Sequence, residues 1–205
     1  MAKINASFYQ REDVLLIAQQ LLGSTLVTNI NGVRTAGIIV ETEAYAGVTD
    51  RASHAWNNRR TNRTAVMYEP GGVAYVYLCY GIHYLFNIVT NVRDTPQAVL
   101  VRALEPVDGL EIMKERTGNK NPLLTAGPGA LSKAMGIDLH LNGSRLSGNK
   151  IWVEQHSPVS HIDMAADTRV GVQYAGADAF LPYRFYIKNN KWVSKGKGLT
   201  LPLST

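Results

Sequence analysis

Apolar residues recur at helical spacing near the N-terminus and at strand-like spacing directly after it. The apolar members of residues 12–22 fall on one helical face and Gly23 follows as a stop signal, so this stretch predicts an amphipathic helix. Residues 25–29 and 34–45 are rich in apolar and β-branched side chains, which is typical of strands. Asn31-Gly32 lies between these two runs and is a strong signal for a hairpin turn.

The next third of the chain predicts a long loop followed by a second hairpin. Residues 50–69 are polar, rich in Asn and Arg and weakly periodic, so we expect a loop with one helical turn. Two β-rich runs follow at 73–78 and 84–90, and Gly81 lies between them. This arrangement predicts two antiparallel strands with their turn at Gly81.

Short elements account for the remainder of the pattern. The apolar run at 98–103 predicts a strand, and 106–116 predict a helix with Leu110 and Met113 facing the core. The last predicted elements are a helix at 130–135 after a glycine-rich turn, and strands at 151–154, 169–172 and 183–187. Because strands follow strands instead of alternating with helices, we expect one α+β domain over 1–205, an antiparallel sheet with peripheral helices.

Composition narrows the class of protein that this pattern describes. Of the 205 residues 45% are hydrophobic and 18% charged, which is enough apolar material for a buried core and excludes a disordered chain. The longest apolar runs fall well short of the roughly 18 residues of a membrane span, so no membrane association is expected. A single cysteine, Cys79, excludes an internal disulfide and a multi-cysteine zinc site. The formal charge of +5 points to an anionic partner such as nucleic acid.

Two carboxylates and an aromatic residue close the second predicted strand. Strand alternation places Glu41, Glu43 and Tyr45 on one face, together with Ile39. Both glutamates could be solvated at a strand end, or they could form an inverting-glycosidase pair, since i and i+2 lie about 6.6 Å apart. Side-by-side projection from one face disfavours the pair, because acid and base must flank the substrate. A single glutamate acting alone as a general base is the more plausible chemistry.

Tyrosines gather on the strand before the second turn. Tyr75 and Tyr77 share a face with Cys79, where they could be core residues or a surface on which a base stacks. Tyr80 stands at the predicted hairpin tip beside Gly81, where a large aromatic side chain would be exposed. Such a residue can insert between stacked bases, which again points to nucleic acid.

The polar loop carries a cluster of arginines. Arg59, Arg60 and Arg63 suit contacts to DNA phosphates, although by themselves they are better explained as a solvated surface. His54 in the same loop reads by itself as a structural histidine. The five histidines lack paired metal spacing and no phosphate-binding glycine loop occurs, so we expect neither a metal nor another cofactor.

Several ordered motifs resemble the signature of the alkyladenine (3-methyladenine) DNA glycosylase family. They run in family order over about residues 8–194 and therefore cover nearly the whole chain. The matching stretches are Glu41-Thr42-Glu43-Ala44-Tyr45 with Gly47, Asp50 and Ala52-Ser53-His54, then Tyr75-Val76-Tyr77, Tyr80-Gly81, Asn87, residues 99–106, Gly127-Pro128, 169–172, 184–187 and 192–194. This string is far more specific than any isolated motif.

The resemblance implies a role for each matching residue. Glu43 matches the general base that activates a water molecule, and Arg102 with the backbone carbonyl of Val170 matches the groups that hold that water. The implied walls of the base pocket are Tyr45, His54 and Tyr77, with Asn87 as a floor residue that screens purine substituents. Tyr80 matches the residue inserted into the DNA stack. The family fold is a curved antiparallel sheet with a protruding, DNA-inserting hairpin.

The activity implied is that of a monofunctional DNA glycosylase that starts base excision repair. It flips alkylated purines of the 3-methyladenine type, with hypoxanthine or ethenoadenine as further candidates, out of duplex DNA and hydrolyses the N-glycosidic bond. A non-enzymatic nucleic-acid binding module and a hydrolase of free nucleosides or sugars are the alternatives. We expect a monomer that acts on damaged double-stranded DNA in the bacterial cytoplasm at the nucleoid, in preference to a nuclear protein.

Overall fold

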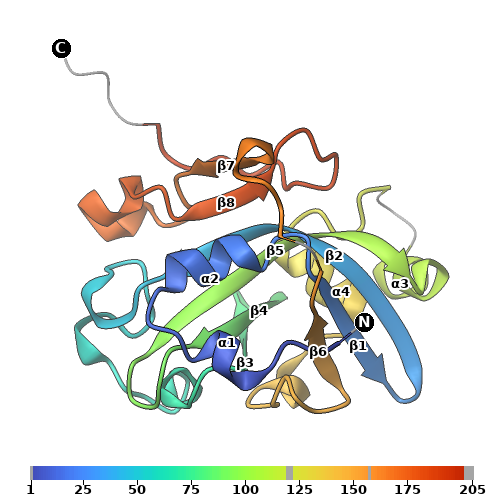
Figure 1. Ribbon diagram of the computed structural model, residues 1–205, viewed down its shortest axis with the longest axis horizontal. Helices are drawn as coiled ribbons and strands as arrows, with labels where there is room; N and C mark the ends of the chain where they lie inside the picture. The colour runs from blue at the N-terminus through green and yellow to red at the C-terminus, as the bar shows by residue number, and fades with distance from the viewer. Residues whose placement is uncertain (1, 119–121, 157, 201–205) are drawn as a thin grey trace.

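A single curled antiparallel sheet organises the protein (Figure 1). The computed structural model describes residues 2–118, 122–156 and 158–200, and within them the sheet has eight strands. They are β1 (Thr25–Ile30), β2 (Val33–Tyr45), β3 (Ala74–Cys79), β4 (His83–Thr90), β5 (Gln97–Asp108), β6 (Ile151–Glu154), β7 (Met164–Asp167) and β8 (Arg184–Ile187). Six strands follow the order β3-β4-β5-β2-β1-β6, while β8 joins β2 to β7. The predicted α+β class with an antiparallel sheet is confirmed.

Short helices pack against the apolar face of this sheet. They are α1 (Ala6–Tyr9), α2 (Val14–Gln20), α3 (Leu110–Thr117) and α4 (Pro128–Met135). The first predicted helix is confirmed as α2, which begins after Asp13, whose side chain accepts hydrogen bonds from the backbone N–H groups of Leu15 and Leu16. Ile17 of α2 and Leu131 of α4 belong to one buried cluster with side chains from β2, β4 and β5. Helix α1 was not predicted.

The side chains of strand β5 point alternately into the core and to the opposite face of the sheet. Val99 and Val101 belong to the buried apolar cluster. Leu100 and Arg102, on the other face, line a cleft. Because successive strand side chains point to opposite faces, the same strand supplies both the core and the wall of the cleft.

Strand β2 carries a bulge that changes which of its residues share a face. It pairs with β1 over its first half and with β8 at residues 41–43, and the pairing with β5 shifts register around Val40. Ile39 therefore lies in the apolar core, whereas Glu41 and Glu43 face Arg102. The prediction that Ile39 shares the face of the two glutamates is wrong, because the extra residue at Val40 reverses the alternation.

Two further predicted elements differ in the structure. The helix predicted at 106–116 begins only at Leu110, because Pro106 is still in β5, opposite Gly37 at a register shift where a proline can be tolerated. Leu110 is exposed, so only Met113 faces the core as predicted. No strand forms at 169–172, where Gly171 has φ +77°, a value incompatible with extended backbone. Strand β7 ends just before this segment.

The two predicted hairpins are both present. Asn31 and Gly32 have φ +53° and +82° in the turn between β1 and β2. Strands β3 and β4 pair from Ala74 opposite Ile88 to Cys79 opposite His83. Among the described residues, no helix has the length and apolar character needed to cross a membrane.

Candidate active site

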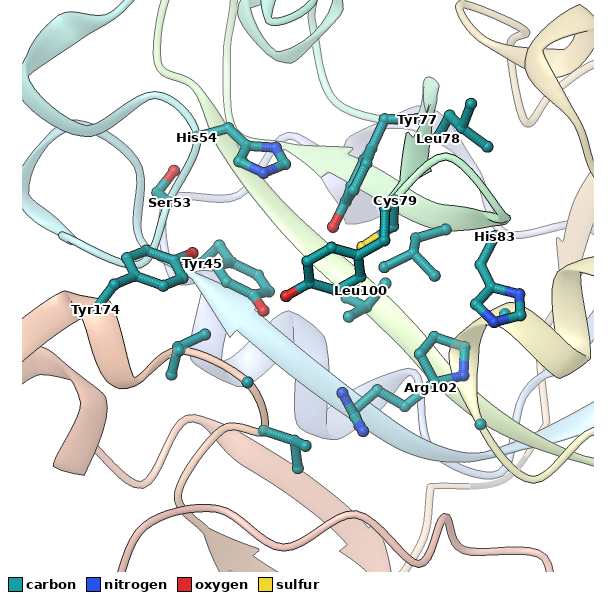
Figure 2. A pocket seen from close by; sticks show the side chains of 18 of the residues that line it. Tyr45, Ser53, His54, Tyr77, Leu78, Cys79, His83, Leu100, Arg102 and Tyr174 are labelled. Atoms are coloured by element: carbon teal, nitrogen blue, oxygen red, sulfur yellow. The ribbon is translucent and has the colours of Figure 1, made fainter.

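A cleft of about 1130 Å³ lies on the face of the sheet that carries Arg102 (Figure 2). Figure 2 shows Tyr45, His54 and Tyr77 around one opening, with Arg102 reaching in beside them. These side chains come from β2, the loop after it, β3 and β5. The cleft therefore brings together residues that lie up to 129 positions apart, from Tyr45 to Tyr174.

Glu43 lies at the base of this cleft with its carboxylate fully buried. Its Oε1 accepts a hydrogen bond of 2.8 Å from the backbone N–H of Val170 and lies 3.1 Å from Nη1 of Arg102. Its Oε2 accepts a hydrogen bond of 2.9 Å from the hydroxyl of Tyr45. Since all three partners line the cleft, the carboxylate sits just beneath the cleft surface.

Glu41 is equally buried but is bound in a different way. Its Oε1 accepts from Nε of Arg102 at 2.8 Å, Nε of Arg184 at 2.7 Å and the Ser194 hydroxyl at 2.9 Å, and its Oε2 accepts from the Ser194 backbone N–H at 2.7 Å. These contacts occupy the carboxylate with protein donors, so Glu41 is a structural anchor. The solvated strand end is therefore wrong for Glu41 and Glu43 alike, and the glycosidase pair is excluded.

Arg102 links the two carboxylates. Its side chain is 6% exposed and spans from Glu41 to Glu43. Burial works against the charge of its guanidinium, but the two carboxylates outweigh burial and raise the pKa of Arg102 above its usual value. Arg102 is thus a permanent cation placed between two carboxylates.

The aromatic walls of the cleft are neutral side chains. The ring of His54 meets that of Tyr77 edge-on, with centroids 4.7 Å apart, and its Nδ1 lies 2.9 Å from the Tyr75 hydroxyl. Burial, reinforced by Arg63 and Arg59, lowers the pKa of His54 to about 4. His54 therefore carries no charge near neutral pH.

Asn87 lies behind these walls and does not line the large cleft. It borders a separate cavity of about 40 Å³ together with Tyr45, His54 and Tyr77. Its side-chain amide donates to the backbone carbonyl of Tyr75 at 3.2 Å. Asn87 is thus placed beneath the pocket walls, where a pocket-floor residue would have to be.

An ion pair that was not predicted supports one wall. Arg169 is 1% exposed and its Nη1 and Nη2 lie 2.5 and 2.9 Å from the carboxylate of Asp50. The guanidinium also lies 4.9 Å from the ring centroid of Tyr45 and donates to the carbonyl of Ala44. Arg169 immediately precedes Val170, so the pair fixes Tyr45 and the Val170 backbone relative to each other. The residues are 119 positions apart, and nothing in the local pattern links them.

Tyr80 stands fully exposed at the tip between β3 and β4. Its side chain is 90% exposed, its φ is +50°, and Gly81 follows with φ +73°. The backbone N–H of Ile82 donates to the carbonyl of Cys79 at 3.1 Å, which closes a type I′ turn. A bulky residue with positive φ costs about 1–2 kcal/mol, and such strain is typically retained for a function.

The arginine cluster of the loop divides into two groups. Arg59 and Arg63 line the cleft, and the guanidinium of Arg63 lies 4.9 Å from the ring centroid of Tyr77. Arg60 pairs with Asp94 at 3.0 Å, outside the residues that line the cleft. Two of the three arginines therefore line the cleft, and the third does not.

Two exposed aromatic residues on the cleft were missed by sequence reasoning. Among the described residues, the large exposed hydrophobic side chains include three aromatics, Trp56, Tyr80 and Tyr174, and all three line this cleft. Figure 2 shows Tyr174 at the edge near Tyr45. The exposed apolar character of the cleft indicates a binding surface. Within the same part of the chain, no group of three His, Cys, Asp or Glu side chains could hold a metal ion.

These features define a class of protein. A buried, charge-paired carboxylate beneath neutral aromatic walls, with arginines and an exposed tyrosine at the rim, is an arrangement that can perform acid–base chemistry on a substrate with a planar ring and phosphate groups, such as a nucleotide. The family model for methylpurine-DNA glycosylases matches residues 7–191, and the chain belongs to this family. It is therefore an enzyme of DNA repair, a DNA glycosylase that hydrolyses N-glycosidic bonds.

Relatives similar to this chain are of nearly the same length. A protein from Carboxydothermus hydrogenoformans is 49% identical over 92% of this chain and 96% of its own. Proteins from Natranaerobius thermophilus and Bacillus cereus are each 44% identical, over 94% and 92% of this chain and 98% and 97% of their own. All three carry the provisional name 3-methyladenine DNA glycosylase.

Proposed function

We propose that this glycosylase takes alkylated purines of the 3-methyladenine type out of duplex DNA and hydrolyses their N-glycosidic bond with a water molecule activated by Glu43. The observation that carries the proposal is the buried carboxylate of Glu43, held by Val170, Arg102 and Tyr45 beneath an open cleft. The names of the relatives support the substrate class. Hypoxanthine and ethenoadenine are proposed as further substrates.

The chemistry requires a base but no acid for a cationic substrate. The oxygen of water attacks C1′ of the deoxyribose while one of its protons passes to Glu43. The electron pair of the C1′–N bond leaves with the purine, which becomes neutral because alkylation had made it cationic. Arg102, 3.1 Å from the carboxylate of Glu43, and the backbone carbonyl of Val170 hold the water in place.

The flipped base is proposed to stack between Tyr45 on one side and His54 with Tyr77 on the other. Tyrosine faces attract a cation through the ring quadrupole, so a positively charged alkylated purine gains affinity there. Because the pKa of His54 is lowered to about 4, the imidazole adds no repelling charge. Asn87, beneath these walls, screens the substituents of the purine.

DNA is proposed to lie across the rim of the cleft. Tyr80 inserts into the base stack and fills the space that the flipped nucleotide leaves, a role that its exposure at the turn permits. Arg59 and Arg63 are placed for phosphate contacts beside the cleft. Arg60 stays a prediction, and DNA would have to compete with Asp94 for its guanidinium.

Single-lesion duplexes test the activity. Wild-type protein should release free base from a duplex that carries one alkylated purine, and Glu43→Gln should bind the same duplex without releasing the base. A non-enzymatic binding module would release nothing, and a nucleoside hydrolase would act equally well without the duplex. Because water is the nucleophile, borohydride should trap no protein–DNA adduct. A stable adduct would refute the water mechanism.

We further propose that the chain, residues 1–205, is one glycosylase domain that acts as a monomer. Residues 201–205 lie outside the described part of the chain. The relatives come from bacteria, which supports the bacterial assignment, and association with the nucleoid follows from the proposed DNA substrate. Light scattering of the purified protein with and without duplex DNA measures the oligomeric state.

A further inference from the structure

We propose that the hydroxyl of Tyr45 is a positioning group for Glu43, in addition to any stacking by the ring. The inference rests on the proposed function, because it concerns the same carboxylate. The phenol oxygen of Tyr45 lies 2.9 Å from Oε2 of Glu43. Among the described residues, the Tyr45 hydroxyl is the group that donates a hydrogen bond to Oε2. Tyr45 would thus both form a wall of the cleft and orient the base beneath it.

The two oxygens of Glu43 are engaged unequally. Oε1 meets both the Val170 N–H and Arg102 Nη1, whereas Oε2 meets the Tyr45 hydroxyl. An ionised carboxylate has about four acceptor positions, which the four donors around Glu41 fill, whereas Glu43 has three donors and keeps one position, on Oε2, its less occupied oxygen. That position is where the proton of the attacking water is received: the water O–H bond breaks, the Oε2–H bond forms, and the hydroxyl oxygen bonds to C1′ as the purine leaves.

Toward the carboxylate of Glu43 the phenol acts as the donor. Burial, and then the charge of Glu43, raises the pKa of Tyr45 well above its usual value, so the hydroxyl keeps its proton. The ring is held from behind by the guanidinium of Arg169, 4.9 Å from its centroid, which is itself bound to Asp50. Because the ring is held in place, the hydroxyl that it carries is positioned to donate to one oxygen of Glu43.

Other charged and titratable groups near Glu43 also influence how base release depends on pH. The charged groups are Arg102 from β5, Glu41 from β2, Arg184 from β8 and Arg169 from the segment after β7, and the neutral titratable group is Tyr174 from that same segment. Tyr45→Phe changes none of these groups and leaves the ring in place. Its effect on the pH dependence of base release therefore reports the lost hydrogen bond to the carboxylate.

Single-turnover release of 3-methyladenine from a methylated duplex, measured from pH 4.5 to 9, tests the inference. For Tyr45→Phe we expect the acid limb of the pH–rate profile to move up by about one pH unit. The hydrogen bond from the Tyr45 hydroxyl stabilises the ionised carboxylate more than the protonated one, so its loss favours the protonated form. The plateau rate should fall about tenfold, while affinity for the damaged duplex stays within about threefold, since the ring remains. Tyr77→Phe is the matched control, because its hydroxyl does not contact Glu43, and its acid limb should stay where the wild type has it.

A second variant moves the profile in the opposite direction. Fluorotyrosine at position 45 is a stronger hydrogen-bond donor and should shift the acid limb to lower pH. An unchanged limb in both position-45 variants, or an equal shift in Tyr77→Phe, would overturn the inference and leave the proposed function standing. Base release by Glu43→Gln, in contrast, would refute the proposed function itself.

Discussion

The clearest test of the site uses the two glutamates of β2, which are two residues apart, fully buried and both paired with Arg102. We expect Glu41→Gln to lose stability and Glu43→Gln to lose activity. The difference follows from the donors around each carboxylate, since glutamine offers one acceptor oxygen and one amide donor in the same shape.

Glutamine cannot satisfy the site of Glu41 in either orientation. If its oxygen faces Arg102 and Arg184, its NH₂ group meets the backbone N–H of Ser194, which donates at 2.7 Å in the native protein. If the amide is turned over, its NH₂ group meets the two arginines instead. Breaking a buried ion pair by removing one partner costs roughly 3–5 kcal/mol. For a protein of this size that is a fall in Tm of about 6–20 °C.

Glutamine fits the site of Glu43 much better. Its oxygen can accept from the Val170 N–H and Arg102, and its NH₂ group can donate to the Tyr45 hydroxyl, which only has to rotate its proton. Arg102 also keeps Glu41 as its anion. The expected cost is therefore about 1 kcal/mol, or about 2–4 °C in Tm.

Thermal unfolding followed by circular dichroism, with base release measured on the same preparations at a temperature where all variants are folded, gives both readouts. Glu41→Gln should retain measurable release at that temperature, whereas Glu43→Gln should release no base. The reasoning is refuted if Glu41→Gln melts within 3 °C of the wild type, a margin set at about 1 kcal/mol. It is equally refuted if Glu43→Gln is the variant that unfolds.

Three further predictions follow from the cleft and its rim. Tyr80→Asn should stabilise the free protein by about 1 kcal/mol, because Asn tolerates the positive φ of a type I′ turn, yet weaken binding to a damaged duplex; thermal melts and fluorescence anisotropy measure the two opposite effects. Arg59→Ala and Arg63→Ala should each reduce the slope of log affinity against log salt by about 1, and Arg60→Ala should change it less, which a salt titration of duplex binding checks. The pKa of His54 is lowered from 6.5 to about 4, so the unfolded chain binds a proton in this window that the folded protein does not, and stability is complete above about pH 6.5 and declines toward pH 4. His54→Gln should remove that part of the decline in urea unfolding at pH 4.5 and 7, and an identical decline in both proteins would contradict it.

The functional residues that sequence reasoning found share one property: their chemistry is visible in a local run. Glu43 and Tyr45 close an apolar strand, and Tyr80 precedes the glycine of a turn. The family resemblance then supplied roles for them that spacing alone left open. Asp50 and Arg169 also lie in stretches that match the family. Their ion pair joins residues 119 positions apart, so no local pattern in either stretch indicates it.

Local periodicity by itself determined the order of most strands and helices, the two hairpin turns and the α+β class, because these depend on side-chain spacing of two or 3.6 residues. The tertiary structure decided what spacing cannot. Because of the bulge at Val40, Ile39 points into the core while both glutamates face Arg102, and contacts from Arg184 and Ser194 make Glu41 an anchor. Two glutamates of identical chemistry on one strand thus differ only in their neighbours from β5, β8 and the C-terminal segment, and the number of donors that each receives separates a structural carboxylate from one with an acceptor position to spare.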